Sequence, residues 1–476
     1  MKKTPEGKEN VTRALYFSSS PTIFTQGRGQ PSSLRVFIGV NDISGNYSAL
    51  WEGFQAIGLS ATLVVESPHP FGYGDVQSIP NVNARFDEFR QRCLSLRLPW
   101  GIRILARGLI SETRRIGNFL IRFHWAIRMI RSHDVFIFGF GSSLLPRNLD
   151  LPIISLLPKK FIISNLEHGS EARPPVADAA WRQEIDLVVP TRTLRILTKR
   201  TKRMVVRHEQ FADIIIGNPL STGYFAKKPI VNTYFLGRPL RPGTTTPSRS
   251  NKSNPLGDRP LRVAHIPSHA LSKGTDVIEA TLTNLEAQGS LFEFVSISNV
   301  LNKEVLDILS GVDLLIDQIY SDRYWSKIAA EAATLGKPTL VAGYGFDLLE
   351  KFVPSHLRPP VFSCHPEEFE DLLRSILADP ESIQEMGSKA QTFASTTYKA
   401  ANVAERYLRL LRPDQIPPVW FFDPEDIDYP WGVGQDTQLT SANYRRLWRK
   451  YGARALQLGH KPKSLRLIRE RFDLHG

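Results

Sequence analysis

The chain has 476 residues and a formal net charge of +13, with 42 % hydrophobic and 22 % charged residues. This length allows about two to four globular domains, and the positive excess favours an anionic partner. The two cysteines, Cys93 and Cys364, exclude a disulfide framework, and no apolar run of about 18 residues occurs that could span a membrane.

The first half of the chain alternates predicted strands and helices. Residues 1–34 lack the continuous apolar core of a signal peptide, so we expect a disordered lead-in. Buried strands are predicted at 35–40 and 61–65, with a glycine loop and a helix between them, which indicates a parallel sheet. Strands at 134–140 and 161–164 continue the sheet, with weaker candidates at 187–189 and 214–216. These elements predict an N-terminal Rossmann-like domain over residues 35–240, which the family resemblance described below would make the acceptor domain.

A linker separates this domain from a second one. Residues 241–260 are rich in Pro, Ser, Thr, Asn and Gly and nearly lack apolar residues. The alternation restarts over 261–411, with strands predicted at 261–266, 293–297, 313–316 and 339–342. Helices are predicted at 275–288, 303–310, 324–335, 366–378, 381–395 and 398–411. The Pro- and aromatic-rich residues 412–476 are interpreted as an appended helical module.

The expected fold class is therefore α/β, with two Rossmann-like domains facing a cleft. In such sheets ligands bind beyond the carboxyl ends of the strands, so the cleft between the domains is the expected pocket.

The stretch from 263 to 343 holds two residues suited to a nucleoside diphosphate. Lys273 and Gly274 stand where a helix is predicted to begin, and a helix N-terminus next to a lysine suits a diphosphate. Glu331 lies within an Ala-rich helix, where a carboxylate can accept the hydroxyls of a ribose. A solvated Lys-Gly turn and an exposed helical glutamate are the structural alternatives.

This stretch resembles the nucleotide-sugar-binding half of GT-B glycosyltransferases, especially the large retaining family of bacterial sugar transferases (group 1, or family 4-like). The matching residues are His265, Pro267, Ser268, Lys273, Gly274, Thr275, Asp317, Gln318, Glu331, Ala332, Gly336, Lys337 and Pro338. The resemblance covers about 150 residues well and extends more loosely over 35–240. It implies that Lys273 binds the donor diphosphate and acts in catalysis, and that Glu331 holds the ribose of UDP or GDP. The implied donor site comprises Ser268, Lys273, Gly274, Thr275, Asp317, Gln318, Asp322 and Glu331.

The chain departs from the family pattern at two points. Arg323 stands where the family often has a glutamate that contacts the transferred sugar, and a cation cannot accept hydrogen bonds from sugar hydroxyls. Either Asp322 or the backbone replaces that glutamate, or the sugar is held differently. The usual upstream arginine of the phosphate site is also absent, because Ser268 and His269 occupy the matching region.

Two loops of the N-terminal half complete the expected site. The segment NDISGNY (41–47) follows the first strand, where Gly45 and Asn46 permit close approach of the backbone to a ligand. The segment NLEHGSEARPP (165–175) resembles a family loop in which His168 would face the donor sugar or acceptor and act in catalysis. Glu171 replaces an aspartate there, and Arg173 would order the loop. An ordinary strand-to-helix loop and a structural His-Gly turn are the alternatives.

No metal or other cofactor is expected beyond the nucleotide-sugar co-substrate. The D-x-D pattern Asp426–Ile–Asp428 lies in the Pro-rich tail with no strand before it, so we interpret it as chance. Residues 101–131 combine seven arginines with apolar residues at near-helical spacing. They favour either an anionic membrane surface or a helix packed on the sheet with its arginines in solvent. Residues 192–207 form a second basic patch, and without stacking platforms a nucleic-acid partner is not expected.

The sequence thus predicts a retaining, metal-independent glycosyltransferase that moves a hexose from a nucleotide diphosphate sugar to a glycan, lipid-linked or protein acceptor. Its expected place is the cytoplasm, including the inner membrane surface. The alternative is a catalytically inactive GT-B-like protein that binds nucleotide sugars or serves as a scaffold on membranes.

Overall fold

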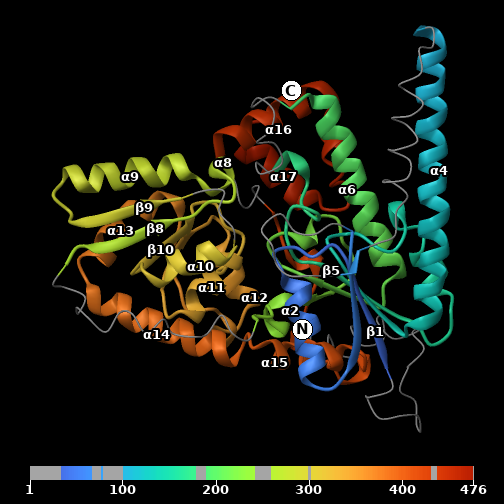
Figure 1. Cartoon of the computed structure of the whole chain (residues 1–476). Coiled ribbons are helices and arrows are strands. Elements are labelled where there is room, and N and C mark those ends of the chain that lie inside the picture. The colour runs from blue at the N-terminus through green and yellow to red at the C-terminus, as the bar shows by residue number, and fades with distance from the viewer. Residues whose placement is uncertain are drawn as a thin grey trace, which may run out of the picture.

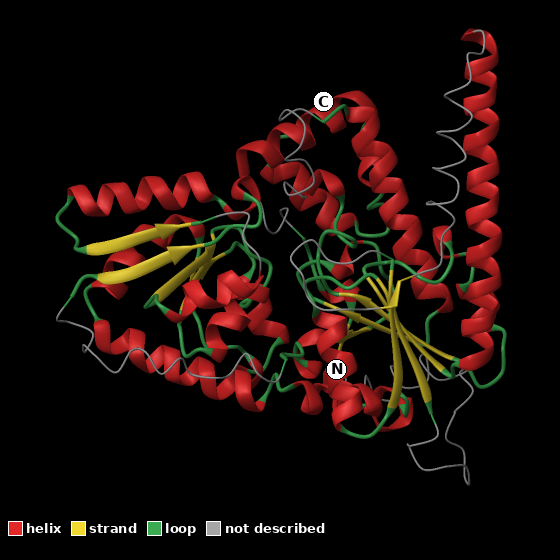
Figure 2. Cartoon of the chain, in the orientation of Figure 1, coloured by secondary structure: helices red, strands yellow, loops and turns green. Residues whose placement is uncertain are grey.

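The computed structural model of the chain describes residues 34–66, 77–78, 100–177, 189–241, 259–297, 302–429 and 437–474. Two sheets, each flanked by helices, lie side by side (Figure 1; Figure 2). The predicted lead-in and most of the predicted linker fall outside the described residues, as does the candidate strand at 187–189 except for Val189. The predicted α/β class with two parallel-sheet halves is confirmed.

The first sheet has eight strands in the order β13-β7-β6-β5-β4-β1-β2-β3. All neighbours pair in parallel except β13 with β7. The strands are β1 (Arg35–Val40), β2 (Ser60–Val65), β3 (Gln77–Ser78), β4 (Val135–Gly139), β5 (Phe161–Leu166), β6 (Ile214–Gly217), β7 (Ile230–Asn232) and β13 (Phe421–Phe422).

Alternating side chains of the first sheet meet different helices. Val36 and Ile38 of β1 pack towards α2 (Asn46–Ala56) and α15 (Ala400–Leu410). Phe37, between them, packs towards α4 (Trp100–Ser132) and α5 (Leu151–Ser155). Because successive side chains of a strand point to opposite faces, both faces of this sheet are covered, as expected of a parallel sheet. Helices α6 (Thr191–Phe211) and α7 (Thr233–Leu236) complete this half.

The second sheet has five parallel strands in the order β12-β11-β10-β8-β9. They are β8 (Leu261–His265), β9 (Phe292–Ser296), β10 (Leu314–Gln318), β11 (Thr339–Ala342) and β12 (Phe362–Cys364). Its helices are α8 (Ala270–Lys273), α9 (Thr275–Ala287), α10 (Asn302–Ser310), α11 (Lys327–Thr334), α12 (Phe346–Phe352), α13 (Phe369–Leu377) and α14 (Pro380–Thr396). Helix α11 begins later than the predicted residue 324 because the Ser326 side chain caps it, accepting from the Ala329 N–H.

The end of the chain returns to the first sheet. Helix α15 lies within the stretch predicted as the second domain, yet it packs against α2 in the core of the first. The contact is close, since a Cβ on Gly53 of α2 would stand 2.3 Å from the Ala400 carbonyl oxygen. Helices α16 (Thr437–Tyr451) and α17 (Pro462–Arg471) pack in the cluster that contains Tyr224 and Ile230 of the first half. The C-terminal residues therefore belong to the first half's packing.

Candidate functional site

A pocket of about 210 Å³ lies where the two halves meet, and we call it the interdomain pocket. It stands beyond the carboxyl ends of β1, β5 and β10, where parallel sheets place their ligands. Its described lining comprises Ile43, Ser44, Asn46, His168, Arg173, Arg238, Ser272, Gln318, Tyr320, Asp322, Arg323, Ser326 and Lys327. The five predicted site residues in this set are Asn46, His168, Arg173, Gln318 and Asp322.

Asp322 joins the two halves at the centre of the pocket. Its Oδ2 accepts from Nη1 of Arg173 at 2.7 Å, and its Oδ1 accepts from Nε of Arg323 at 3.0 Å. Arg323 reaches back to the first half, where its Nη2 donates to the carbonyl of Glu167 at 2.7 Å. All three charged side chains are buried or nearly so. Burial acts against ionisation of Asp322, but the charges of Arg323 and Arg173 outweigh it and hold the pKa of Asp322 below its usual value.

Arg323 therefore has a structural role that the sequence did not reveal. The carboxylate of Asp322 and the backbone carbonyl of Glu167 both accept from its guanidinium. Burial lowers the pKa of Arg323, but the Asp322 carboxylate outweighs this effect and raises it. The backbone carbonyl of Asp322 also accepts from Nδ2 of Asn218 at 2.8 Å. The position where a sugar-binding glutamate was expected thus holds a contact between the halves.

His168 lies in the pocket wall as a neutral imidazole. Burial lowers its pKa to about 4, and the nearby Glu167 carboxylate only partly offsets this. Its Nε2 lies 3.1 Å from Oη of Tyr47, and its backbone N–H donates to Glu171 Oε1 at 2.8 Å. Burial raises the pKa of Glu171 to about 7, and Glu171 Oε2 has no hydrogen-bond partner among the described residues. Near neutral pH, His168 can therefore exchange hydrogen bonds with a sugar hydroxyl without carrying charge.

The pocket is strongly cationic. Its described lining has four cations, Arg173, Arg238, Arg323 and Lys327, against the carboxylate of Asp322. Burial and the neighbouring Arg323 lower the pKa of Arg238. The guanidinium of Arg238 makes no hydrogen bond or ion pair with any other residue in the described parts of the chain.

The N-terminus of α11 opens into the same pocket. Ser326 caps the helix and Lys327 is its first residue, and both line the pocket. The first N–H groups of a helix lack intrahelical acceptors and carry a partial positive charge, so this end adds to the cationic character. The start of α2 differs, because Asp42 Oδ1 already accepts from the Tyr47 N–H at 2.8 Å. Asn46 at that end keeps a buried Oδ1 with no partner among the described residues.

Lys273 and Glu331 lie beside the pocket rather than in its described lining. Lys273 Nζ donates to Asp317 Oδ1 at 2.8 Å, which neutralises its charge. Glu331 is buried in α11 at 4 % exposure, and Lys327 Nζ lies 3.9 Å from its Oε1. Lys327 is therefore the counter-charge that the buried Glu331 needs. Because the two residues are one helical turn apart, Glu331 in turn stabilises the charge of Lys327 in the pocket wall.

The other predicted donor residues shape the turn that leads to α9. Gly274 has φ of 70°, and a Cβ there would lie 2.9 Å from the Ile319 side chain, so glycine is required on both grounds. Thr275 Oγ1 lies 2.9 Å from Nε2 of the buried His265. Ser268 is exposed. Gly45 has φ of 70° and precedes α2.

Sequence reasoning missed Arg238 and Lys327. Arg238 follows the Gly237 turn and lies just before the linker, where no motif marks it. Lys327 stands four residues before Glu331, a spacing at which opposite charges pair on a helix, so this signal was present in the sequence.

No cluster of three His, Cys, Asp or Glu side chains suited to a metal ion occurs in the described ranges. Within the same ranges, each helix is too short or too polar to cross a lipid bilayer.

Comparison with known proteins finds similar solved structures, whereas no family model and no curated protein sequence matches the chain. Anabaena HepE in complex with UDP is 11 % identical, with 79 % of this chain and 99 % of HepE covered and a TM-score of 0.44. Sucrose-phosphate synthase from Thermosynechococcus elongatus is 12 % identical, with 80 % and 98 % covered and a TM-score of 0.45. TarM from S. aureus is 10 % identical, with 79 % and 99 % covered and a TM-score of 0.47.

Proposed function

We propose that the chain is a glycosyltransferase that moves a hexose from a nucleotide diphosphate sugar to an acceptor at the interdomain pocket. The observation that carries the proposal is the guanidinium of Arg238. It is partly buried, lines the pocket beside Lys327 and the start of α11, and makes no hydrogen bond or ion pair with another described residue. An arginine in this state fits a bidentate anion such as a diphosphate.

The same cations suit the chemistry of the transfer. When the bond between the sugar and the diphosphate breaks, negative charge grows on the leaving diphosphate. Donors already aimed at that charge lower the barrier without reorganisation. Arg238, Lys327 and the α11 N-terminus would supply this stabilisation, so the proposal needs no metal ion. The family resemblance adds that the transfer retains the anomeric configuration of the sugar. Neutral His168 would form a hydrogen bond to the sugar or to the acceptor.

Lys273 and Glu331 keep their proposed roles with one addition. Lys273 would share its ammonium between Asp317 and a donor phosphate, since it lies next to Ser272 of the pocket wall. Glu331 would bind the ribose while paired with Lys327, which links nucleoside binding to the diphosphate site. We expect Lys273→Ala and Glu331→Ala each to abolish transfer while the protein remains folded.

Calorimetry with UDP, GDP and their hexose conjugates tests the proposal directly. We expect calorimetry to show binding of either the UDP or the GDP compounds. In separate activity assays we expect slow release of free hexose from the conjugate, and activity that persists after chelation by EDTA. NMR of the released or transferred sugar reads its anomeric configuration. Loss of activity on chelation that Mg²⁺ restores would refute the metal-independent mechanism, and absence of binding to every nucleotide would refute the function.

A nucleotide-sugar-binding protein without catalysis is the second candidate. The observation behind it is that both oxygens of Asp322 are engaged by arginines, which leaves the expected sugar-binding carboxylate occupied. Tight binding of a nucleotide sugar with neither hydrolysis nor transfer, over a panel of glycan and lipid acceptors, would favour this candidate.

We also propose that α4 places the protein on an anionic membrane surface. Trp125, Ala126 and Ile130 of α4 pack on the first sheet. Apolar side chains in the preceding turns of the helix are exposed to solvent. Ile116 is 55 % and Leu120 58 % exposed. In Figure 1 the N-terminal end of α4 projects beyond the rest of the structure. Exposed apolar side chains on a basic helix suit an anionic interface.

Vesicle co-sedimentation tests this placement. The double variant Ile116→Gln, Leu120→Gln is expected to lose binding to phosphatidylglycerol vesicles. The matched control Leu291→Gln, Val419→Gln removes two apolar side chains that are 81 % and 64 % exposed elsewhere. Equal binding by the two double variants would contradict the role of α4.

A further inference from the structure

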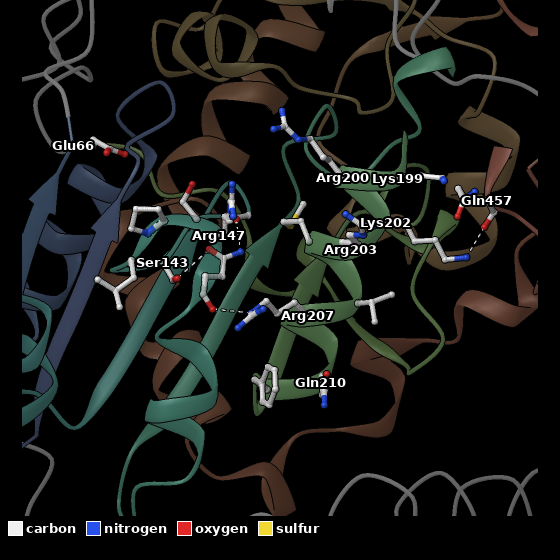
Figure 3. A pocket seen from close by; sticks show the side chains of 18 of the residues that line it. Glu66, Ser143, Arg147, Lys199, Arg200, Lys202, Arg203, Arg207, Gln210 and Gln457 are labelled. Carbon is white, nitrogen blue, oxygen red and sulfur yellow. Dashed lines mark hydrogen bonds between the residues drawn. The ribbon is translucent and has the colours of Figure 1, made fainter. Parts of the chain in front are cut away.

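A second and larger concavity lies on the first half. This groove of about 1380 Å³ is lined by Arg122 of α4, by the loop that follows β4 and by α6. We call it the basic groove. Figure 3 shows residues of that loop and of α6. Its described lining includes one acidic residue, Glu66, and seven cations: Arg122, Arg147, Lys199, Arg200, Lys202, Arg203 and Arg207. A concentration of like charge in a concave surface focuses the electrostatic potential and attracts anions.

Carboxylates of the described residues leave most of these charges without an ion pair. Glu66 pairs with Arg122. Lys202 Nζ donates to the carbonyl of Gln457 at 2.7 Å, a contact that orients the ammonium without cancelling its charge. Arg200 and Arg203 are exposed and form no ion pair within the described ranges. Holding like charges this close is unfavourable in the absence of an anion.

The loop opposite α6 is held in an uncommon conformation. Arg147 has φ of 59° and Asn148 φ of 58°, in the left-handed region that non-glycine residues seldom adopt. Two hydrogen bonds keep this backbone in place: Arg207 Nε donates to the Asn148 carbonyl at 2.8 Å, and the Asn148 N–H donates to the Leu145 carbonyl at 3.1 Å. In Figure 3, Arg147 lies on one side of the groove and Lys202, Arg203 and Arg207 lie on the other. Unfavourable backbone conformations that surrounding contacts hold in place are found preferentially at ligand-binding positions.

A buried histidine supports the loop from below. Asn148 Nδ2 donates to the carbonyl of Gly141 at 3.0 Å and to Nε2 of His208 at 2.9 Å. His208 Nε2 is thus an acceptor, and its Nδ1 donates to Ser164 Oγ at 2.7 Å. Burial lowers the pKa of His208 to about 4, in keeping with this neutral tautomer. The groove wall therefore rests on a satisfied buried network.

The wall of the groove is linked to the wall of the interdomain pocket, although the two share no described lining residue. Ser142 lines the groove, and its Oγ accepts from Nδ2 of Asn41 at 2.8 Å, at the start of the loop whose Ile43 and Ser44 line the pocket. Phe140, one residue before the groove lining begins, has its ring centroid 6.0 Å from that of His168. A chain lying in the groove would lead towards His168.

We propose that the basic groove binds an extended anionic glycan and presents it to the interdomain pocket as the acceptor. The acceptor role rests on the function proposed above. The volume exceeds that of typical small-molecule pockets, which are about 300–1,000 Å³, so an oligomer fits better than a single anion. A concave groove excludes a bilayer surface. Phe211 is the one Phe, Tyr or Trp in the described lining, whereas binding of single-stranded nucleic acid uses several aromatic side chains on which successive bases stack.

Fluorescence anisotropy with labelled oligosaccharides tests the binding in the absence of nucleotide. An oligogalacturonate and a heparin-derived oligosaccharide separate carboxylate from sulfate recognition, and a dextran oligosaccharide is the neutral control. We expect at least one anionic probe to bind, and the double variant Arg200→Glu, Arg203→Glu to weaken it by about tenfold or more. The matched control Lys351→Glu, Lys389→Glu makes the same change in net charge at exposed sites outside the groove and should stay within about twofold of the native Kd.

The outcomes distinguish this proposal from the function. If UDP or GDP binds but neither anionic probe does, the groove assignment is overturned and the transferase remains. If the probes bind but no nucleotide does, the acceptor role falls together with the proposed function. Equal weakening by both double variants means non-specific attraction and overturns the groove. Tighter binding of single-stranded DNA, or of anionic vesicles alone, through Arg200 and Arg203 would replace the glycan with another class of partner.

Discussion

Replacing Asp322 by asparagine should destabilise the protein and at the same time strengthen its binding of a nucleotide. The carboxylate is buried and faces Arg173 and Arg323, with Arg238 in the same pocket. The neutral amide keeps the shape but leaves buried guanidinium groups without a counter-charge. Removing one member of a buried ion pair costs about 3–5 kcal/mol.

The expected effects can be measured separately. A loss of this size lowers the melting temperature by roughly 6–20 °C, using about 2–4 °C per kcal/mol for domains of comparable size. UDP, or GDP if that is the cognate nucleotide, would then bind more tightly than to the native protein, because its phosphates meet the arginines without competition from Asp322. Differential scanning fluorimetry reads the first effect and calorimetry with the nucleotide alone reads the second.

Asp313→Asn is the matched control. Asp313 is a buried carboxylate that accepts from Nη1 and Nη2 of Arg259 at 2.7 and 2.8 Å, but it lies at the opposite end of β10 from the pocket. We expect this variant to lose stability with no change in nucleotide affinity. The reasoning is refuted if Asp322→Asn melts within about 1 °C of the native protein, or if its nucleotide affinity is unchanged or weaker.

Three further outcomes are expected. Arg238→Met should weaken UDP or GDP binding by roughly 10- to 150-fold, the equivalent of about 1.5–3 kcal/mol for a charge-assisted contact, without lowering the melting temperature; a Kd within twofold of native would contradict the site. Gly53→Ala should cost about 1–3 kcal/mol in urea unfolding because its Cβ meets the Ala400 carbonyl, and full stability would show that α15 can shift. The neutral His168 and His208, with pKa values of about 4, contribute stability that is lost as pH drops from about 6.5 towards 4, because the unfolded chain binds protons first. Burial raises the pKa of Glu171 to about 7, which acts in the opposite direction, so the measurement is the difference between two proteins: relative to the native protein, His208→Gln should lose less stability over this range.

The sequence was sufficient for the elements whose signal is local. Apolar runs predict β1 and β11 to the residue, because a strand buried on both faces must be continuously apolar. Gly274 predicts the start of α9, since few other residues adopt its φ of 70°. Strands β7 and β12, of three residues each, were missed, because so short a run carries little periodicity.

The charged centre of the site could not be predicted in the same way. Arg173 and Asp322 are 149 positions apart, and Arg323 meets Glu167 across 156. No local pattern states which cation will face which carboxylate over such separations. The sequence therefore located His168, Asp322 and Arg323 as notable residues without showing that they converge.

The chain by itself determined two parallel α/β halves, because hydrophobic periodicity and helix-capping residues act over a few neighbours. Only the tertiary structure decided that α15 returns to the first sheet, that Arg238 and Lys327 face the interdomain pocket, and that the arginines of α6 line a groove beside Arg147. These depend on which distant surfaces bury their apolar area together, and burial then sets the partners and pKa values of the charges left between them.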